Sequence, residues 1–143
     1  MTETIRRELT LGAPPSRVWR ALTDCSEIAE WMYPNDFKPE VGHRLTLSVP
    51  VNPKADFDGV VRCEVIECVQ QKTLCFTWEG GDVVGTTVRH ELEGAGDGTL
   101  LRFEHAGFDL DAPWGEQALR GAECGWKMML DRLAERVAKP TQA

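Results

Sequence analysis

Hydrophobic and polar residues alternate at the start of the chain, where Ile5, Leu9 and Leu11 are separated by polar positions. A period of two is typical of a strand with one buried face, so the pattern predicts a strand at about residues 2–11. Further strand patterns lie at residues 45–49, 60–69, 73–78, 85–93 and 99–105, separated by a polar loop at 50–58 and turns at 79–82 and 94–98. Five consecutive strands joined in this way predict an antiparallel meander.

Two short helices are predicted between the first two strands. Proline is preorganised for a first helical turn, so Pro14-Pro15-Ser16 opens the first helix. Its apolar side consists of Val18, Trp19 and Leu22. Thr23-Asp24 ends this helix, and residues 26–31 form the second. Residues 33–36 form a loop, because the residue before a proline is disfavoured in helix.

A long amphipathic helix is predicted between residue 112 and about residue 138. Apolar residues recur there in steps of three and four, at Ala118, Ala122, Trp126, Met129, Leu130, Leu133 and Val137. This spacing places them on one helix face. The opposite, solvated face carries Glu123, Lys127, Asp131 and Glu135. Pro113 suits the first helical turn, and Pro140 marks the stop.

This order of elements predicts an α+β layer arrangement. The sheet has one apolar face and the last helix has one apolar stripe, so each buries itself against the other. A twisted sheet that curves around one helix leaves room for a cavity, and concave apolar spaces are the usual small-molecule sites. The chain contains no internal repeat, low-complexity tract or long linker. We therefore expect one domain over residues 1–143.

The charge balance narrows the classes of partner. The 143 residues include 16 Lys and Arg against 23 Asp and Glu, a net charge of −7. Binding to nucleic acid depends on clustered basic residues, so none is expected. No apolar run is long enough to cross a bilayer, and the start of the chain has no signal-peptide core, so we expect a cytoplasmic protein without membrane insertion.

The five cysteines also favour a cytoplasmic location. Cys25, Cys63, Cys68, Cys75 and Cys124 are odd in number and widely spaced, and no Cys-x-x-Cys occurs. This is unlike a secreted disulfide framework or a zinc ribbon. Free cysteine usually behaves as a small buried hydrophobe, so all five are predicted to be core thiols.

Several segments in fixed order resemble one known superfamily. They are residues 13–24 (Ala-Pro-Pro-Ser-Arg-Val-Trp-Arg-Ala-Leu-Thr-Asp), 30–32, 39–42, 76–79, 98–108 and Gly125-Trp126 with Leu130 and Leu133. The chain resembles the helix-grip domains of the START and Bet v 1 (SRPBCC) superfamily, in the branch similar to the C-terminal domain of the activator of heat-shock protein 90 ATPase. The resemblance implies a helix-grip fold, with a curved sheet wrapped around the last helix. It does not select one function, because the superfamily includes lipid carriers, polyketide cyclases, hydroxylase subunits and co-chaperone modules.

Aromatic residues supply most pocket candidates, because aromatic side chains dominate both cores and ligand sites. The candidates are Trp31, Trp78, His90, Phe103, His105, Trp126 and Met129. The resemblance places the last helix over the cavity and the second short helix near its mouth. Trp19 is interpreted as core. For Trp31, packing in the core and contact with a ligand are equally supported, whereas packing in the core is favoured for Trp126.

Two histidines fall within predicted strands. His90 alternates with Val88 and Leu92 on the apolar side of its strand. It is either a core histidine hydrogen-bonded to a neighbour, which we favour, or a titratable group in the pocket. His105 lies in a segment shared with the family, which implies a structural or pocket-shaping role. His43 is expected in a turn, without a role.

The sequence gives little support for a metal site, a catalytic nucleophile or a phosphate-binding site. The sequence lacks metal-ligand spacing, a Gly-x-Ser-x-Gly elbow and a phosphate-binding glycine loop before a helix, so no metal, cofactor or catalytic nucleophile is expected. Arg7 shares the inward face of its strand with Ile5 and Leu9. It either anchors an anionic ligand or pairs with a carboxylate at the sheet edge, and we favour the ion pair.

Three functional hypotheses remain. The favoured one is a binding module, a monomer or homodimer that holds a small apolar or aromatic molecule without chemistry. The second is an enzyme similar to polyketide cyclases and aromatases, with His90 as general acid or base and His105 behind it. The third is a co-chaperone module, which we disfavour because full-length activators carry a separate N-terminal domain that this chain lacks.

Gly125 is expected to leave room for a facing strand or a ligand, since glycine is costly inside a helix.

Overall fold

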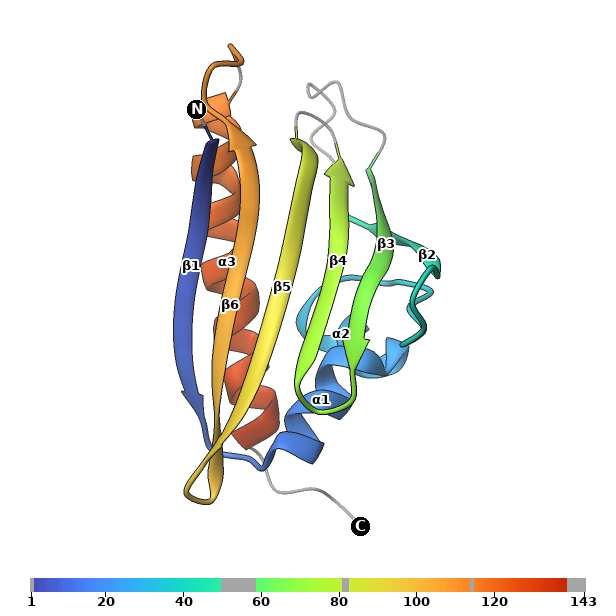
Figure 1. The fold of residues 1–143 in the computed structure, drawn as a ribbon, viewed down its shortest axis with the longest axis vertical. Coiled ribbons are helices and arrows are strands. Elements are labelled where there is room, and N and C mark those ends of the chain that lie inside the picture. The colour runs from blue at the N-terminus through green and yellow to red at the C-terminus, as the bar shows by residue number, and fades with distance from the viewer. Residues whose placement is uncertain (1, 50–58, 81–82, 114, 139–143) are drawn as a thin grey trace.

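A six-stranded antiparallel sheet and a long C-terminal helix form the two layers of the molecule (Figure 1). The computed structural model describes residues 2–49, 59–80, 83–113 and 115–138. The elements are β1 (Thr2–Leu11), α1 (Pro15–Thr23), α2 (Cys25–Trp31), β2 (Arg44–Ser48), β3 (Val60–Val69), β4 (Thr73–Gly80), β5 (Val83–Ala95), β6 (Gly98–Asp109) and α3 (Gly115–Ala138). The strand order is β1-β6-β5-β4-β3-β2. The predicted α+β helix-grip fold is confirmed.

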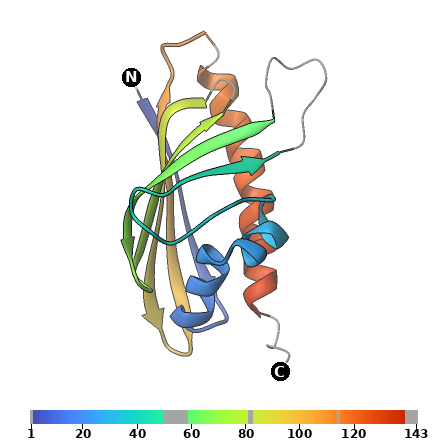
Figure 2. The same cartoon turned by 90° about the vertical axis from the view of Figure 1, so that its right-hand side faces the viewer.

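The sheet curves, with α3 running along its inner side and α1 and α2 at one end (Figure 2). Consecutive strands from β2 to β6 pair antiparallel, so the predicted meander is confirmed, and β1 joins it beside β6. The turn between β5 and β6 is shorter than predicted, and Gly96 at φ 60° occupies the left-handed conformation that glycine tolerates.

The end of β4 differs from the prediction. Glu79 and Gly80 were expected in a turn, but they continue the strand, because Glu79 is paired with Arg62 of β3 and Gly80 with Val83 of β5. The remainder of that turn, and the predicted loop at 50–58, lie outside the described residues.

One residue separates the two short helices. The Asp24 carboxylate accepts hydrogen bonds from the backbone N–H groups of Ser26 at 2.9 Å and Glu27 at 3.4 Å, so Asp24 is the N-cap of α2. The Asp24 N–H in turn donates to the Arg20 carbonyl and closes the last turn of α1. The predicted break at this point is therefore confirmed, and α2 begins at Cys25.

The packing of α3 changes along its length. Its second half buries Trp126, Met129, Leu130, Leu133 and Val137, whereas its apolar residues before Trp126 are small or only half-buried. Pro113 was predicted in the first turn of the helix, but it lies in the turn before the helix. The Gly115 N–H closes that turn by donating to the Ala112 carbonyl at 3.0 Å. Pro140 lies outside the described residues.

The cysteines divide by position. Cys63 and Cys75 are buried and Cys68 is half-buried, all on strands. Burial raises the pKa of Cys63 to about 12, so this thiol is unreactive. Cys25 and Cys124 are exposed, so the prediction of five core thiols was wrong for both. The first residue of α2 and the outer face of α3 contact too little of the core to bury them.

Candidate functional site

An aromatic cluster fills the space between the sheet and α3, and it contains most of the predicted pocket residues. Trp78 of β4, His90 of β5, Phe103 and His105 of β6, and Trp126 and Met129 of α3 are all buried. The Trp126 ring centroid lies 4.5 Å from that of Phe103 and 5.2 Å from that of Trp78. These contacts, at the distances typical of aromatic pairs, fix the helix against the sheet.

Trp31, on α2, has a structural contact of its own. Its ring is buried and its Nε1–H donates a hydrogen bond of 2.8 Å to the Ala21 carbonyl of α1. This bond fixes α2 against α1. Trp19 is 8% exposed, which confirms its place in the core.

A chain of buried hydrogen bonds crosses from α3 to the sheet. Trp126 Nε1–H donates to His105 Nδ1 at 2.8 Å. His105 Nε2 lies 2.9 Å from Thr86 Oγ1, and the Thr86 hydroxyl donates to the Trp78 carbonyl at 2.5 Å. Because the hydroxyl proton is used on the carbonyl, the Thr86 oxygen accepts from His105.

These partners select one tautomer of His105. The indole N–H requires an acceptor at Nδ1 and the Thr86 oxygen requires a donor at Nε2, so the ring is neutral with its proton on Nε2. Burial lowers the pKa of His105 to about 3. Both ring nitrogens of His105, for which a structural or pocket-shaping role was predicted, are therefore occupied by hydrogen bonds within the core.

His90 has the opposite environment. Its ring is buried between Phe76 and Phe103, at centroid distances of 6.2 Å and 5.4 Å, and its Nδ1 has no hydrogen-bond partner among the described residues. The favoured interpretation, a hydrogen-bonded core histidine, is therefore wrong at Nδ1. Burial lowers the pKa of His90 to about 4. The ring is neutral at pH 7.

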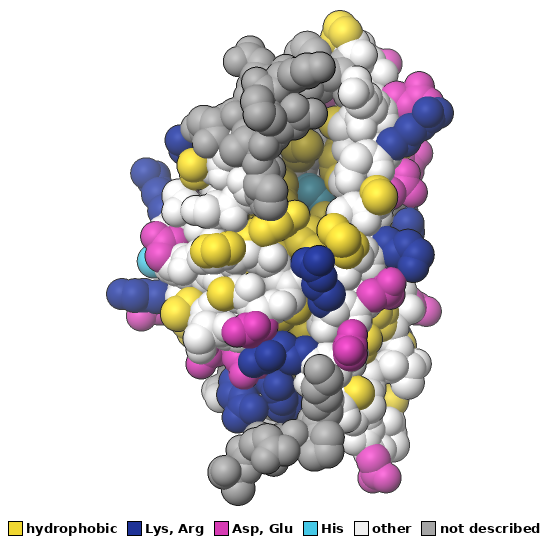
Figure 3. Space-filling model, turned by 180° about the vertical axis from the view of Figure 1, so that it is seen from behind, with side chains coloured by type: hydrophobic (Ala, Val, Ile, Leu, Met, Phe, Trp, Pro, Cys, Tyr) yellow, Lys and Arg dark blue, Asp and Glu magenta, His cyan; other side chains and the backbone are white. Residues whose placement is uncertain are grey.

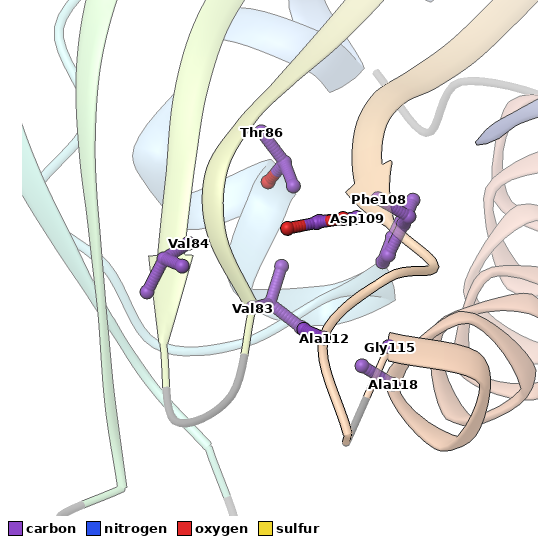
Figure 4. A pocket seen from close by; sticks show the side chains of 8 residues that line it. All are labelled: Val83, Val84, Thr86, Phe108, Asp109, Ala112, Gly115 and Ala118. Atoms are coloured by element: carbon purple, nitrogen blue, oxygen red, sulfur yellow. The ribbon is translucent and has the colours of Figure 1, made fainter. Parts of the chain in front are cut away.

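A small pocket lies where β5, β6 and the start of α3 meet (Figure 4). Its volume is about 40 Å³, and its walls are Val83, Val84, Thr86, Phe108, Asp109, Ala112, Gly115 and Ala118. Thr86 and Asp109 are the two polar residues of this otherwise apolar lining, and the Thr86 hydroxyl is already hydrogen-bonded to His105 and to the Trp78 carbonyl. Sites for drug-sized ligands measure roughly 300–1,000 Å³, so the pocket holds only a small group as it stands.

The surface beside α3 is hollowed on the same side of the sheet. Figure 3 shows hydrophobic side chains around a hollow with a histidine visible at its bottom. Ala118 and Ala122, on the first half of α3, are only half-buried, and Ala118 also lines the small pocket. A large cavity within the described residues is not confirmed, because the aromatic cluster occupies the interior.

Sequence reasoning missed the residues that line the pocket, including Thr86 and Phe108. A signal for Thr86 was present, because it precedes Val88, His90 and Leu92 at intervals of two and therefore points to the same inner face. Phe108 lies beyond the predicted end of its strand, so its direction could not be assigned from alternation.

Arg7 follows the favoured interpretation. Its guanidinium lies 3.4 Å from the Glu123 carboxylate of α3, and both side chains are nearly half exposed. The partner is on the helix rather than at the sheet edge, because the inward face of β1 lies against α3. Arg7 thus contributes a surface ion pair rather than an anchor inside the pocket.

The described residues contain neither a cluster of metal ligands nor a membrane-spanning helix. No group of three or more His, Cys, Asp or Glu side chains is placed to hold a metal ion there. None of the helices in that part of the chain is long and apolar enough to cross a membrane.

The fold is a helix-grip fold of the SRPBCC type. Residues 12–138 match the family described as "Activator of Hsp90 ATPase homolog 1-like protein", and the chain belongs to this family. The comparison with curated proteins found no match.

Three solved structures are similar over nearly the whole chain. MLL2253 from Mesorhizobium loti is 34% identical with a TM-score of 0.82, and the match covers 98% of this chain and 100% of that one. DynU16, from the dynemicin biosynthetic locus, is 22% identical with a TM-score of 0.72, over 98% of this chain and 49% of that one. The Aha1 dimer from Colwellia psychrerythraea is 20% identical with a TM-score of 0.69, over 96% and 99%. The last two likenesses establish the fold alone.

Proposed function

We propose that this chain binds a small apolar or aromatic molecule between the sheet and the first half of α3. The observation that carries the proposal is the apolar pocket at the meeting of β5, β6 and α3, with Thr86 and Asp109 as its two polar groups. An apolar wall with a few convergent polar groups is the common composition of small-molecule sites.

The weak packing of the first half of α3 supports the proposal. Ala118 and Ala122 are only half-buried there, whereas Trp126 and the buried residues after it fix the second half of the helix. A ligand larger than the pocket enters by displacing the first half outward, while the hydrogen bond between Trp126 and His105 remains. Elements with few buried contacts are the ones that open at low cost.

Binding without chemistry is favoured over catalysis. A general base works best with a pKa near the working pH. Burial lowers the pKa of His90 to about 4 and that of His105 to about 3, and both His105 nitrogens are already hydrogen-bonded. Neither ring suits the acid–base role that a cyclase would require.

We further propose the domain organisation, location and partners of the protein. The chain acts as one domain over residues 1–143 in the cytoplasm, and it needs no cofactor, nucleic acid or chaperone partner. Native mass spectrometry of the purified protein, followed by denaturing extraction, tests it for a co-purifying small molecule. Recovery of an apolar compound in a stoichiometric amount supports the carrier role and identifies the chemical class.

A titration with toluene tests the site. Amide resonances of Thr86, Phe108 and Ala118 are expected to shift as toluene is added, and Ala118→Trp, which fills the pocket, is expected to abolish the shifts. Ala138→Trp is the matched control, because Ala138 is exposed on the same helix. Equal binding by both variants, or no shift in the unmodified protein, would overturn the proposal.

A further inference from the structure

The two edges of the sheet differ in how their outward backbone groups are satisfied. At the β2 edge, the Thr46 N–H donates to the Asp36 carboxylate at 2.7 Å, and the Ser48 N–H donates to the Pro34 carbonyl at 3.0 Å. A bridge between Asn35 and Leu47 holds this segment against the strand. The chain therefore covers this edge with its own backbone, which prevents further strand pairing.

Among the described residues, the outward backbone groups of the β1 edge are bonded only by side chains of their own strand. Figure 1 shows β1 at the border of the molecule, with α3 behind the sheet. The Thr4 N–H is bonded at 3.1 Å to the carboxylate of its neighbour Glu3, and the Arg6 carbonyl at 2.6 Å to the guanidinium of its neighbour Arg7. These groups therefore point away from β6, and the alternation of an antiparallel strand extends the same direction to Glu8 and Thr10. Within the described ranges, no segment covers them.

The sequence of β1 is complementary to itself. When two copies pair antiparallel about a two-fold axis at Arg7, Arg6 of each faces Glu8 of the other and Thr4 faces Thr10. The outward-facing residues then meet in pairs that exchange both backbone hydrogen bonds. Opposite charges that face each other across strands stabilise such a pairing.

The inward face is also matched in this register. Ile5 of one copy faces the half-buried Leu9 of the other, which adds an apolar contact. The two Arg7 side chains face each other at the axis, and each brings its own Glu123 partner from α3 at 3.4 Å. The charges at the axis are thus balanced by two carboxylates.

We infer that a second copy of this chain docks on β1 and continues the sheet across a two-fold axis, with Arg6 opposite Glu8. This interface is separate from the ligand pocket. A shift of the register by two residues would place Arg6 opposite Arg6 or Glu8 opposite Glu8, so electrostatics select this register over its neighbours.

Charge reversal tests the interface and its register together. Sedimentation equilibrium at 10–200 μM, an order-of-magnitude range for a weak edge contact, is expected to show dimerisation of the unmodified protein. Arg6→Glu places two carboxylates opposite each other at two symmetry-related points, so the dissociation constant is expected to rise by roughly tenfold or more. Adding Glu8→Arg to the same chain restores the opposite charges and is expected to recover dimerisation.

Arg44→Glu is the matched control, because Arg44 is an exposed arginine on the edge strand β2 and pairs with Glu64 at 3.4 Å as Arg6 pairs with Glu104. It is expected to dimerise like the unmodified protein. A further variant, Glu8→Pro, removes an outward N–H without breaking the ladder to β6. It is expected to be monomeric with an unchanged melting temperature. A monomer throughout the range, or a dimer equally affected by Arg44→Glu, would overturn the inference.

Discussion

Trp126 of α3 donates its indole N–H to Nδ1 of His105 on β6 at 2.8 Å, and both side chains are buried. The bond joins the helix to the sheet at the point where the well-packed half of α3 begins. It also explains why a neutral imidazole is retained inside the core. The second ring nitrogen of His105, Nε2, donates to the Thr86 hydroxyl oxygen, so both ring nitrogens have a partner. Satisfied polar chains of this kind specify one arrangement of a core.

Trp126→Phe tests the contribution of this bond. Phenylalanine keeps an aromatic ring in the cluster but leaves His105 Nδ1 without a donor. A buried unsatisfied group costs roughly 1–3 kcal/mol, so together with the lost ring area the free energy of unfolding should fall by about 2–4 kcal/mol. Urea unfolding followed by far-UV circular dichroism measures it. The control is Trp19→Phe, the same truncation in the core, with an expected loss of about 1–2 kcal/mol; equal losses would contradict the assignment.

The two buried histidines predict a pH dependence of stability. Their pKa values fall from 6.5 to about 3 for His105 and about 4 for His90, in both cases through burial. Between these values and 6.5 the unfolded chain binds protons that the folded chain does not, so stability is full above pH 6.5 and falls as the pH decreases. Each histidine contributes a slope of up to about 1.4 kcal/mol per pH unit.

Urea unfolding at pH 7.5, 6.5, 5.5 and 5.0, values set by these pKa shifts, measures the slope above the range where carboxylates titrate. His90→Leu removes one of the two titrations, so its slope should be about half as steep. It also removes the unpartnered Nδ1, so its loss of stability at pH 7.5 should be small. A pH-independent free energy of unfolding would show that the histidines are accessible to protons in the folded state.

Local patterns were sufficient to predict most of this fold. The buried positions of β5 alternate along the strand, and those of α3 follow its helical period, so both patterns reflect the single face that each element buries. Errors occurred where tertiary pairing overrides local signals. Gly80 reads as a turn residue, but its pairing with Val83 extends β4.

The site was only partly predictable for a related reason. Alternation assigns His90 and His105 to the same inner face, yet it cannot show which one finds partners. That depends on Trp126, which reaches His105 from an element 21 residues further along the chain. The pocket is likewise formed by segments brought together only in the folded chain, so Thr86 and Phe108 carry no joint signal in the sequence.

Glu27 provides a further stability prediction, because its carboxylate joins three helices. It accepts hydrogen bonds from Arg17 of α1 at 3.0 Å and from Arg136 of α3 at 2.9 Å, with 15% of its own side chain exposed. The Arg136 contact in particular lowers the pKa of Glu27. Glu27→Gln leaves two guanidinium groups facing an uncharged amide.

The free energy of unfolding of Glu27→Gln should fall by about 1–3 kcal/mol, less than for a fully buried pair because Arg136 is one-third exposed. Chemical denaturation at pH 7.5 measures it. Glu116→Gln breaks an ion pair with Arg120 that is largely exposed, so it should change stability by less than about 0.5 kcal/mol. If the two variants lose the same amount, Glu27 does not join the helices.

Gly125 allows the last test, and it concerns why a glycine lies in the middle of α3. A Cβ placed there would meet only the terminal methyl of Met129 at 4.0 Å, so the expected close approach of a facing strand is absent among the described residues. Glycine costs about 1 kcal/mol relative to alanine inside a helix. Gly125→Ala should therefore raise the free energy of unfolding by about 0.5–1 kcal/mol, as measured by thermal and urea unfolding. Gly115→Ala is the contrasting variant, because its Cβ would clash with the Asp109 carbonyl where the chain enters α3, and it should be destabilising.

If Gly125→Ala is stabilised and the toluene-induced amide shifts are unchanged, Gly125 is needed neither for packing nor for the ligand. Loss of those shifts in Gly125→Ala would instead place Gly125 at the ligand site.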